Sequence, residues 1–541
     1  MRRLLLLATG LAAMAAQAER IAPYRQIHRI FAIEPEKIEA ARERSPAAFS
    51  NGVIIATFVG LKIGPAEAKD FERQKAFVAR MKARGVPVQI CLSSTIGHFD
   101  DWQVVQPWPK MVGANGKVTK AVCCPRSAGF RAYVGGLFAK YAALGPDVIW
   151  FDDDFRMAFH PPADNGCFCP DCLKAFRDET GIEIDMKGPQ PRLKTAEIRA
   201  KWFDFGRRTM NELVRIGADA AHKVDPNVAL GFMVANLDVQ AYCPPDLKEW
   251  IRLGRNAKGE VWLRPGSGFY DDFSPYGALQ KNIAIGRLVA ATEGEGVVNV
   301  TEEVTSPYTR RGKSMRITFL EAALNVGLAG ADGTTYDAIK PNLDEQLKDD
   351  AVVAEMARKY PLLDAMYGLV RGKRQIGVAV PPHNANLWKA FCLGIPFTFR
   401  PQHAVAEAPA DFPGGDPLAF ARGEEIKAEL AKRCGGKLPA RADSALRVGL
   451  SLWESPDRRA RTAFVWNLDF DEARDVRLVL DGEFAAEELQ DDGSWKPLGT
   501  GDAFDLAPLA PWSVRVLRLL KAACCVPHRG GGSVMRAVVV K

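Results

Sequence analysis

The sequence predicts an α/β fold: a (β/α)8 TIM barrel followed by a short α/β or linker module and a C-terminal antiparallel β-sandwich. Three observations support this prediction. Eight short, β-branched runs occur between residues 27 and 340, amphipathic stretches separate them, and from residue 445 onward apolar and polar residues alternate. Strands that alternate with helices form parallel sheets, eight such strands close a barrel, and a two-residue period is typical of antiparallel strands.

The order of these runs favours a barrel over an open sheet. A doubly wound sheet is the alternative, but no Gly-x-Gly-x-x-Gly turn follows the first strand. The predicted strands are Ile27–Ile33, Gly52–Phe58, Val88–Ser93, Asp147–Asp153, Val228–Val234, Val261–Pro265, Val297–Glu302 and Gly333–Tyr336. The predicted helices between them are Ala66–Arg84, Ser127–Leu144, Leu193–Val224, Tyr276–Thr292 and Arg316–Leu328.

The remaining chain divides into smaller units. We predict a signal peptide at 1–18, the barrel at 19–370, a reduced α/β module or linker at 371–444, the sandwich at 445–520 and a flexible tail at 521–541. Pro361 is expected to end a last helix, Asp349–Tyr360. A strand is predicted at Gln375–Val380, and the sandwich strands are Arg447–Leu452, Thr462–Leu468, Val476–Leu480, Ala485–Leu489 and Val514–Leu519.

The first residues are typical of a secretory signal peptide. Arg2 and Arg3 precede the apolar run Leu4–Ala16, and Ala16-Gln17-Ala18 has the small-x-small form of a cleavage site. The run is short and rich in alanine, which favours a cleaved signal over the alternative of an uncleaved anchor helix. We therefore expect an exported protein, periplasmic or secreted, with no membrane span in its mature form.

Composition narrows the classes of partner. Hydrophobic residues make up 47% and charged residues 25% of the chain, as in an ordinary globular enzyme. The formal net charge is +7, but lysines and arginines form no dense block interleaved with aromatics. This pattern excludes nucleic acid as the expected partner and leaves a homo-oligomer open.

An acidic triplet ends the fourth predicted strand. Asp152, Asp153 and Asp154 follow an apolar run, and the carboxyl ends of barrel strands form the active face of this fold. Adjacent carboxylates repel one another and raise at least one pKa, which suits a general acid. Strand alternation places Asp152 and Asp154 on one side and Asp153 on the other. Alternatives are a Ca²⁺ or Mg²⁺ site and a purely structural contact with Arg156.

A second acidic pair ends the seventh predicted strand. Glu302 and Glu303 supply, with the triplet, the two carboxylates on different strands that glycosidic cleavage uses. A separation of about 5 Å would predict retention of configuration, and about 6.5–9.5 Å inversion. Other polar and aromatic residues at or near strand ends are predicted to bind substrate: His98, Trp150, Arg156, Asn236, Arg264, Tyr270 and Tyr336.

A cysteine cluster lies just after the acidic triplet. Cys167, Cys169 and Cys172 form a C-x-C-x₂-C motif, whose sulfurs can converge on one tetrahedral metal. Cys124 or Cys123 could supply the fourth ligand. Four thiolates leave no open position, so the motif predicts a structural zinc rather than a catalytic one. One disulfide with free thiols is the alternative.

These motifs together resemble glycoside hydrolase family 42, the β-galactosidases, with this chain as a divergent member. The resemblance covers roughly residues 50–340. It rests on Cys124-Pro-Arg-Ser, Phe130-Arg-Ala-Tyr133, Trp150-Phe-Asp-Asp-Asp154, the segment Cys167–Arg177, Thr301-Glu-Glu-Val-Thr-Ser-Pro307 and Gly330–Tyr336.

The resemblance implies roles for individual residues. Cys124, Cys167, Cys169 and Cys172 would hold zinc, and Glu302 would be the nucleophile, with Glu303 as the alternative. The family's Asn-Glu pair falls on Asp153-Asp154 in one register, which makes Asp154 the acid/base, and on Asp154-Phe155 in the other. Aspartate is one methylene shorter than glutamate, so the substrate geometry must differ from that of a strict β-galactosidase.

Together these residues predict an exported glycosidase that cleaves oligo- or polysaccharides by a two-carboxylate, retaining mechanism. A non-catalytic carbohydrate-binding barrel is the alternative.

Overall fold

The computed structural model describes most of the chain. The described residues are 23–31, 39–40, 42–43, 52–58, 65–93, 95–97, 107–187, 193–234, 245–266, 275–303, 315–339, 350–380, 387–408, 419–436, 438–506 and 508–521. The predicted signal peptide and nearly all of the predicted tail lie outside these ranges. In the described part, no helix combines the length and the apolar character that crossing a membrane requires.

Eight parallel strands close into a barrel, which confirms the predicted fold class. Each strand is hydrogen-bonded to a neighbour on both sides, in the order β1-β12-β11-β10-β9-β6-β3-β2. The strands are β1 (Arg25–Phe31), β2 (Val53–Phe58), β3 (Val88–Ser93), β6 (Val148–Phe151), β9 (Ala229–Val234), β10 (Val261–Pro265), β11 (Val297–Glu303) and β12 (Gly333–Ile339).

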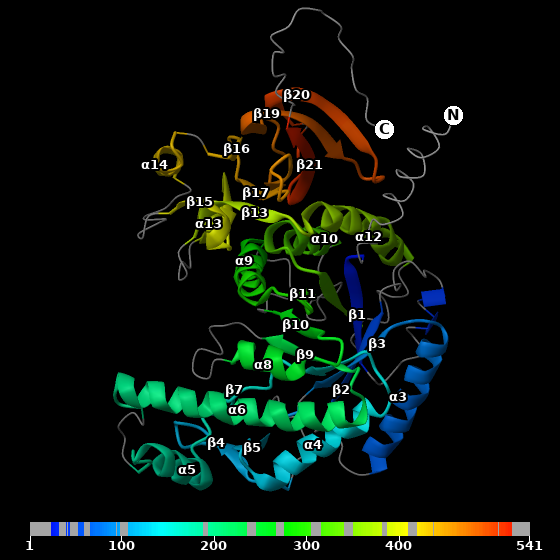
Figure 1. Ribbon diagram of the computed structural model, residues 1–541, viewed down its shortest axis with the longest axis vertical. Coiled ribbons are helices and arrows are strands. Elements are labelled where there is room, and N and C mark those ends of the chain that lie inside the picture. Colours follow the sequence, from blue (N-terminus) through cyan, green and yellow to red (C-terminus); the bar gives the residue numbers. More distant parts are fainter. Residues whose placement is uncertain are drawn as a thin grey trace, which may run out of the picture.

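Helices surround the barrel, as Figure 1 shows. They are α3 (Pro65–Ala83), α4 (Ala128–Ala142), α6 (Ala196–Val224), α8 (Leu247–Gly254), α9 (Pro275–Thr292), α10 (Met315–Leu324) with the π-helical turn η2 (Asn325–Ala329), and α12 (Asp350–Val370). Side-chain caps fix three of the starts. Ser127 accepts a hydrogen bond from the Phe130 amide at α4, Thr195 accepts one from the Ile198 amide at α6, and Asp246 accepts one from the Glu249 amide at α8.

The expectation that Pro361 ends the last barrel helix is wrong. Helix α12 continues through Pro361 to Val370. The proline ring is exposed, while Leu363, Met366 and Tyr367 on the following turns are buried. Burial of these side chains offsets the hydrogen bond that a proline removes from a helix interior, a loss of roughly 3 kcal/mol.

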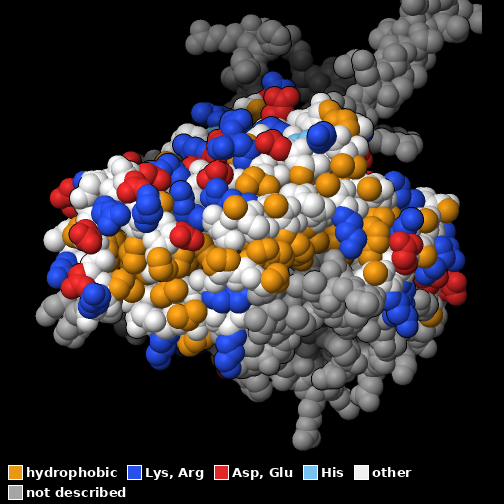
Figure 2. Space-filling view, turned by 90° about the horizontal axis from the view of Figure 1, so that it is seen from below, with side chains coloured by type: hydrophobic (Ala, Val, Ile, Leu, Met, Phe, Trp, Pro, Cys, Tyr) orange, Lys and Arg blue, Asp and Glu red, His pale blue; other side chains and the backbone are white. Residues whose placement is uncertain are grey.

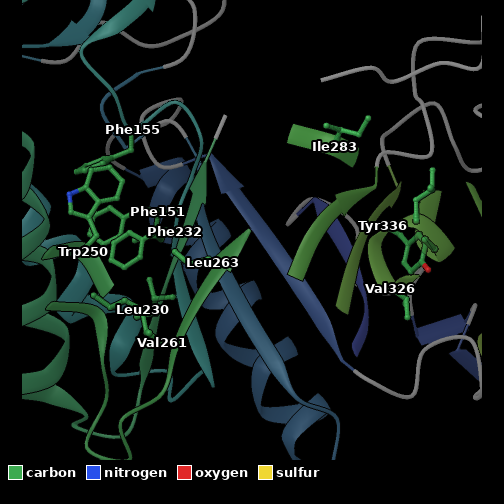
Figure 3. Close-up of a cluster of buried hydrophobic side chains, with 14 of the residues drawn as sticks. Phe151, Phe155, Leu230, Phe232, Trp250, Val261, Leu263, Ile283, Val326 and Tyr336 are labelled. Atoms are coloured by element: carbon green, nitrogen blue, oxygen red, sulfur yellow. The ribbon is translucent and has the colours of Figure 1, made fainter. Parts of the chain in front are cut away.

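Apolar side chains fill both faces of the barrel wall. Inside, Trp150 and Trp262 pack edge to face with ring centroids 6.1 Å apart. Outside, Phe151 stacks on Phe232 at 5.3 Å, and Trp250 of α8 covers Phe232 at 5.4 Å (Figure 3). The two-residue alternation of the strands therefore separates an inner layer from an outer one.

The chain beyond the barrel forms one nine-stranded mixed sheet. Its strands are β13 (Arg374–Ala379), β14 (Leu393–Thr398), β15 (Ala404–Glu407), β16 (Ala440–Asp443), β17 (Val448–Glu454), β18 (Ala460–Asn467), β19 (Arg477–Leu489), β20 (Trp495–Asp505) and β21 (Ser513–Lys521). Short helices α13 (Leu387–Phe391) and α14 (Phe420–Arg433) accompany it. β13 pairs parallel with β14 and antiparallel with β17, so the middle segment joins the antiparallel C-terminal strands in one sheet.

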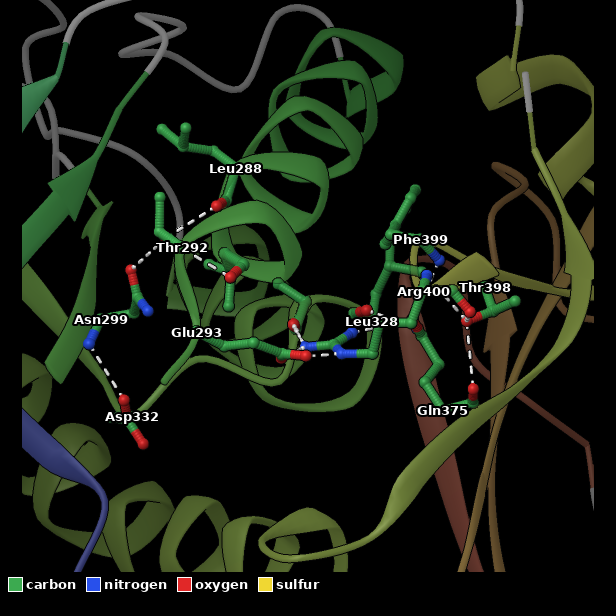
Figure 4. A network of polar contacts seen from close by, with 12 residues as sticks. Leu288, Thr292, Glu293, Asn299, Leu328, Asp332, Gln375, Thr398, Phe399 and Arg400 are labelled. Atoms are coloured by element: carbon green, nitrogen blue, oxygen red, sulfur yellow. Dashed lines mark hydrogen bonds and ion pairs between the residues drawn. The ribbon is translucent and has the colours of Figure 1, made fainter. Parts of the chain in front are cut away.

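A buried polar network attaches this sheet to the barrel helices (Figure 4). Arg400 donates two hydrogen bonds to Glu293, of 2.8 and 2.6 Å, and one of 3.0 Å to Gln375. The Gln375 amide donates to the Leu328 carbonyl at 2.7 Å. Because two guanidinium nitrogens donate to one Glu293 oxygen, Oε2, and the third donates to Gln375, these contacts fix the orientation of Arg400 as well as its position.

Inserted loops cover one side of the barrel. The hairpin β4 (Lys110–Val112) and β5 (Val118–Cys123) follows β3, whereas the hairpin β7 (Ala158–His160) and β8 (Ala163–Asn165) and helix α5 (Pro170–Thr180) follow β6. Both insertions leave the carboxyl ends of barrel strands, so they lie on the side where barrels place active sites. Figure 2 views the molecule from below, where hydrophobic side chains form a band bordered by mixed charges.

Candidate active site and cysteine cluster

Four charged side chains meet inside the barrel at the carboxyl ends of its strands. They are Arg29 of β1, Asp152 directly after β6, Arg264 of β10 and Glu302 of β11. Each lies two residues after a member of the barrel-interior cluster, respectively Ile27, Trp150, Trp262 and Val300. Strand alternation therefore turns all four side chains toward the barrel axis, above a layer of apolar residues.

Each buried carboxylate in this group is paired with an arginine. Arg264 Nη1 lies 2.7 Å from Glu302 Oε1, and both side chains are at most 5% exposed. Arg29 Nη2 lies 3.3 Å from Asp152 Oδ2 and donates a second hydrogen bond to Ser93 Oγ at 3.2 Å. Charges buried this deeply persist only when a partner compensates the loss of hydration.

The electrostatic environment separates the carboxyl groups into two kinds. Burial opposes ionisation of Glu302, but Arg264, Lys281 and Arg29 hold its pKa below the usual range. In the same way, Arg29 and Arg264 outweigh the effect of burial on Asp152 and lower its pKa.

Asp153 responds in the opposite direction, because burial and the charges of Asp152 and Glu302 raise its pKa. A carboxyl group with a raised pKa together with one whose pKa is lowered is the pattern expected of an acid and a nucleophile.

A turn after β6 explains why Asp153 belongs to this group. The strand ends at Phe151, and the Phe155 amide donates to the Asp152 carbonyl at 3.1 Å. The Asp153 amide donates to Asp152 Oδ1 at 3.0 Å. Strand alternation therefore ends at this turn and does not decide which way the Asp153 side chain faces. Asp153 is half-buried and reachable, whereas Asp154 is only 1% exposed.

Gly266 forms the wall against which Glu302 lies. This residue directly follows β10, and its amide donates to the Val234 carbonyl at 2.9 Å. A Cβ atom added at Gly266 would lie 2.4 Å from Glu302 Oε2, far inside van der Waals contact. With Oε1 held by Arg264, the carboxylate is fixed from both sides.

Two predicted substrate-binding aromatics pack in the core. Trp150 is fully buried beneath the carboxylates, and its indole N–H donates to Gln89 Oε1 at 2.8 Å. Tyr336 stacks on His28 at 5.4 Å and on Tyr360 at 5.7 Å, on the outer face of β12 against α12. The interpretation of Tyr336 as pocket lining is corrected, because the side chain points out of the barrel.

Of the remaining predicted site residues, only Arg156 is fully described. His98, Asn236 and Tyr270 lie outside the described residues. The backbone of Glu303 ends β11, but its side chain is outside the described part. The Arg156 guanidinium donates to the carbonyls of Asp153 and Ala158, so it braces the turn that presents Asp153.

Sequence reasoning missed Arg29, Ser93 and Gly266. The signal for Arg29 was a cation two residues after Ile27, on the apolar face of the first strand. Ser93 is the last residue of the predicted third strand, a position that points at the active face. No pattern in the sequence indicates Gly266, because its role depends on a side chain of the neighbouring strand.

The cysteine cluster lies in the inserted loops beside the barrel mouth. The Sγ atoms of Cys124, Cys167, Cys169 and Cys172 all lie within 4.8 Å of one another, and all four residues are buried. The Sγ atom of Cys124 is 3.5 Å from that of Cys169 and 3.6 Å from that of Cys172. Tetrahedral zinc with Zn–S bonds of about 2.3 Å would separate its sulfurs by roughly 3.8 Å, so the four thiols fit a metal.

This geometry decides between the two candidates for the fourth ligand. Cys123 is outside the group, where the Lys110 ammonium donates to its sulfur at 3.8 Å. Burial raises the pKa of the Cys123 thiol to about 11. The four clustered cysteines carry free thiols and make no disulfide, so the expected alternative of one disulfide is not what the structure shows. Cys124 completes the set.

The sequence matches no protein-family model and no curated protein. Solved structures are nevertheless similar. A β-galactosidase from Bacillus circulans sp. alkalophilus has a TM-score of 0.63 at 12% identity, covering 93% of this chain and 99% of that chain. A catalytic mutant of a GH42 β-galactosidase from G. stearothermophilus gives the same four values. The chain has a GH42-like fold.

This fold extends to a further enzyme. α-L-Fucosidase isoenzyme 2 from Paenibacillus thiaminolyticus has a TM-score of 0.59 at 10% identity, covering 93% of this chain and 100% of that chain. At such identities the likeness concerns the fold, and a chemical role has to be argued from the side chains at the barrel mouth.

Proposed function

We propose that this protein is a glycoside hydrolase that cleaves O-glycosidic bonds of oligo- or polysaccharides, with Asp153 as acid/base and Glu302 as nucleophile. The charged cluster at the carboxyl ends of the barrel strands carries the proposal, with Glu302 held by Arg264 at 2.7 Å, and the opposite pKa shifts of Glu302 and Asp153 support it. Asp153 replaces Asp154 as the expected acid, because Asp153 is partly exposed and Asp154 is buried. The GH42-like fold supports the reaction class.

In the proposed first step, the Glu302 carboxylate attacks the anomeric carbon while Asp153 gives its proton to the leaving oxygen. The glycosidic bond breaks, and a glycosyl ester with Glu302 forms. In the second step, Asp153 takes a proton from water, which attacks the same carbon and releases the sugar. Arg264 orients the nucleophile through its 2.7 Å contact.

We propose retention of configuration, which follows from the role of Glu302 as nucleophile. Glu302 raises the pKa of Asp153, so the two carboxyl groups interact electrostatically. Retaining enzymes hold the pair about 5 Å apart, whereas inverting enzymes leave room for a water molecule. We propose galactosides as the first substrates because two of the structures named above are β-galactosidases.

A screen against nitrophenyl glycosides tests the proposed function, with Glu302→Gln as the matched control. We expect the wild type to hydrolyse at least one glycoside and Glu302→Gln to lower kcat/KM by at least about 10³-fold. Proton NMR of the first product should show the anomer of the substrate. Sugar binding without hydrolysis by the wild type would instead support a non-catalytic carbohydrate-binding barrel.

We also propose that Cys124, Cys167, Cys169 and Cys172 hold a structural zinc ion. Four buried sulfurs match its ligand preference and leave no position for substrate. Zinc at this place would tie the loop after β5 to the start of α5. Elemental analysis of purified protein should find about one zinc per chain, and finding none after purification without chelator would contradict the assignment.

Export is proposed from residues 1–18 alone. Cleavage after Ala18 in a secreting host, read by N-terminal sequencing, tests it.

A further inference from the structure

A basic pocket lies on the C-terminal sheet, apart from the barrel mouth. It has a volume of about 330 Å³ and is bounded by the starts of β13, β15 and β18 and the ends of β17 and β21. These elements lie in the upper half of Figure 1, away from the strand ends that carry Glu302. Four basic side chains line it, namely Arg374, Arg458, Arg461 and Lys521.

The carboxylates of this pocket do not neutralise its cations. Only Glu454 and Asp481 line it, which leaves an excess of two positive charges. Glu454 is shared by Arg374 at 2.8 Å and Arg461 at 3.2 Å, and Asp481 pairs with Arg461. Both carboxylates are therefore already engaged, while Lys521 is exposed and has no ion-pair partner among the described residues.

Two buried nitrogen atoms of the pocket lack a hydrogen-bond partner. Arg374 Nε and His403 Nδ1 are both shielded from solvent and contact no acceptor in the described part of the chain. Buried polar groups are nearly always satisfied, and an unsatisfied one costs about 1–3 kcal/mol. Burial and the charges of Arg374 and Arg400 lower the pKa of His403, so the empty pocket resists a further positive charge.

Backbone strain at Arg458 also indicates that this pocket binds a ligand. This residue turns between β17 and β18 with φ of +59°, a conformation that favours glycine. Its guanidinium lies 4.0 Å from Glu454 and remains 74% exposed, so that ion pair contributes little stability. An arginine kept in a strained turn for so weak an ion pair suggests that its charge serves a ligand.

We infer that this pocket binds an oxyanion, either inorganic or carried by a sugar as a sulfate or carboxylate group. Arg374 Nε and His403 Nδ1 would donate hydrogen bonds to the oxygens, while Arg458 and Lys521 close the outer side. A volume near 330 Å³ is at the small end of ligand sites and holds one sugar ring with its acidic group. The site is independent of the proposed glycosidase activity.

Isothermal titration of the full chain with sodium sulfate, sodium phosphate and sodium galacturonate tests the inference, with galactose as the neutral control. We expect at least one anion to bind the pocket, whereas any binding of galactose at the barrel mouth should be the same in Arg458→Gly as in the wild type. Arg458→Gly should weaken binding about tenfold because a charge-assisted contact is lost. The glycine suits the left-handed turn, so this variant should remain folded. Lys521→Gln should weaken binding in the same direction.

Arg459→Ala is the matched control, because it removes the same charge from the same turn without lining the pocket. Its affinity should stay within about twofold of the wild type. Tighter binding of galacturonate than of sulfate and phosphate would identify a sugar acid, and the reverse order an inorganic oxyanion. Absence of binding by all three anions up to about 20 mM, or equal weakening in Arg459→Ala, would overturn the inference.

Discussion

The carboxyl groups at the barrel mouth and the thiols beside it are two acidic clusters built in different ways. At the mouth, residues far apart in sequence meet because strand ends converge, and arginines on neighbouring strands compensate Asp152 and Glu302. In the cysteine cluster, three ligands come from six consecutive residues and the four sulfurs contact one another.

The difference explains what each cluster can do. Protein cations compensate the first cluster unevenly, so the pKa of Asp153 is raised while that of Glu302 is lowered. Such a pair can exchange a proton with a substrate. Thiols packed only against thiols reach a stable charged form when a metal replaces their protons. The first cluster is therefore suited to chemistry and the second to holding loops together.

The largest effect should follow Asp153→Asn. Without the acid, kcat/KM on a glycoside with a poor leaving group should fall by about 10³-fold. The loss should shrink with a dinitrophenyl leaving group, which departs without a proton. Asp154→Asn is the matched control and should change activity less than about tenfold. The reverse ranking of the two variants would return the acid role to Asp154.

The next largest effect on activity should follow Gly266→Ala, because the added Cβ would displace the Glu302 carboxylate from Arg264. We expect kcat to fall about 100-fold with KM nearly unchanged, and the acidic limb of the pH profile to move upward as Glu302 loses its cation. Gly368→Ala, in open space on α12, is the control and should keep full activity. A Gly266→Ala enzyme with wild-type kcat would show that the close contact between Gly266 and Glu302 does not contribute to catalysis.

The pH dependence should reflect the opposite shifts. Glu302 must be ionised, so activity is lost as pH falls through its lowered pKa. Asp153 must be protonated, so activity is lost as pH rises through its raised pKa. Each limb should change kcat/KM about tenfold per pH unit. In Asp153→Asn the basic limb should disappear and the acidic limb should stay, which a pH series of kcat/KM would show.

Removal of a cysteine ligand should affect stability more than chemistry. Cys169→Ser should lower the free energy of unfolding by about 3 kcal/mol, measured in urea, and should abolish zinc binding. The kcat of the folded fraction should fall only a few fold. Cys123→Ser, the neighbour outside the cluster, should keep its metal, and equal metal loss in both variants would contradict the ligand set.

The smallest effect is expected for Tyr336→Phe. Its hydroxyl donates to Gln26 at 3.4 Å on the outer face of the barrel wall. Removing this long hydrogen bond should cost about 1 kcal/mol of stability and change KM less than about twofold. A large rise in KM would place Tyr336 in the pocket after all.

Local patterns predicted the elements well and their ends less well. All eight barrel strands were located because apolar β-branched runs stand out against helical periodicity. The end of β6 at Phe151 was missed, because a turn after a strand leaves no periodic mark among three identical aspartates. The end of α12 was missed because packing of its later turns outweighs Pro361.

The sequence by itself determined the barrel, the acidic strand ends and the C-x-C-x₂-C ligands, because each depends on residues that are close along the chain. The tertiary structure decided that Arg264 pairs with Glu302, that Arg29 compensates Asp152, that Tyr336 points outward and that Cys124 is the fourth sulfur. Those outcomes depend on distances between separate strands and loops. Electrostatic coupling and steric contact act through space, and a linear pattern does not record them.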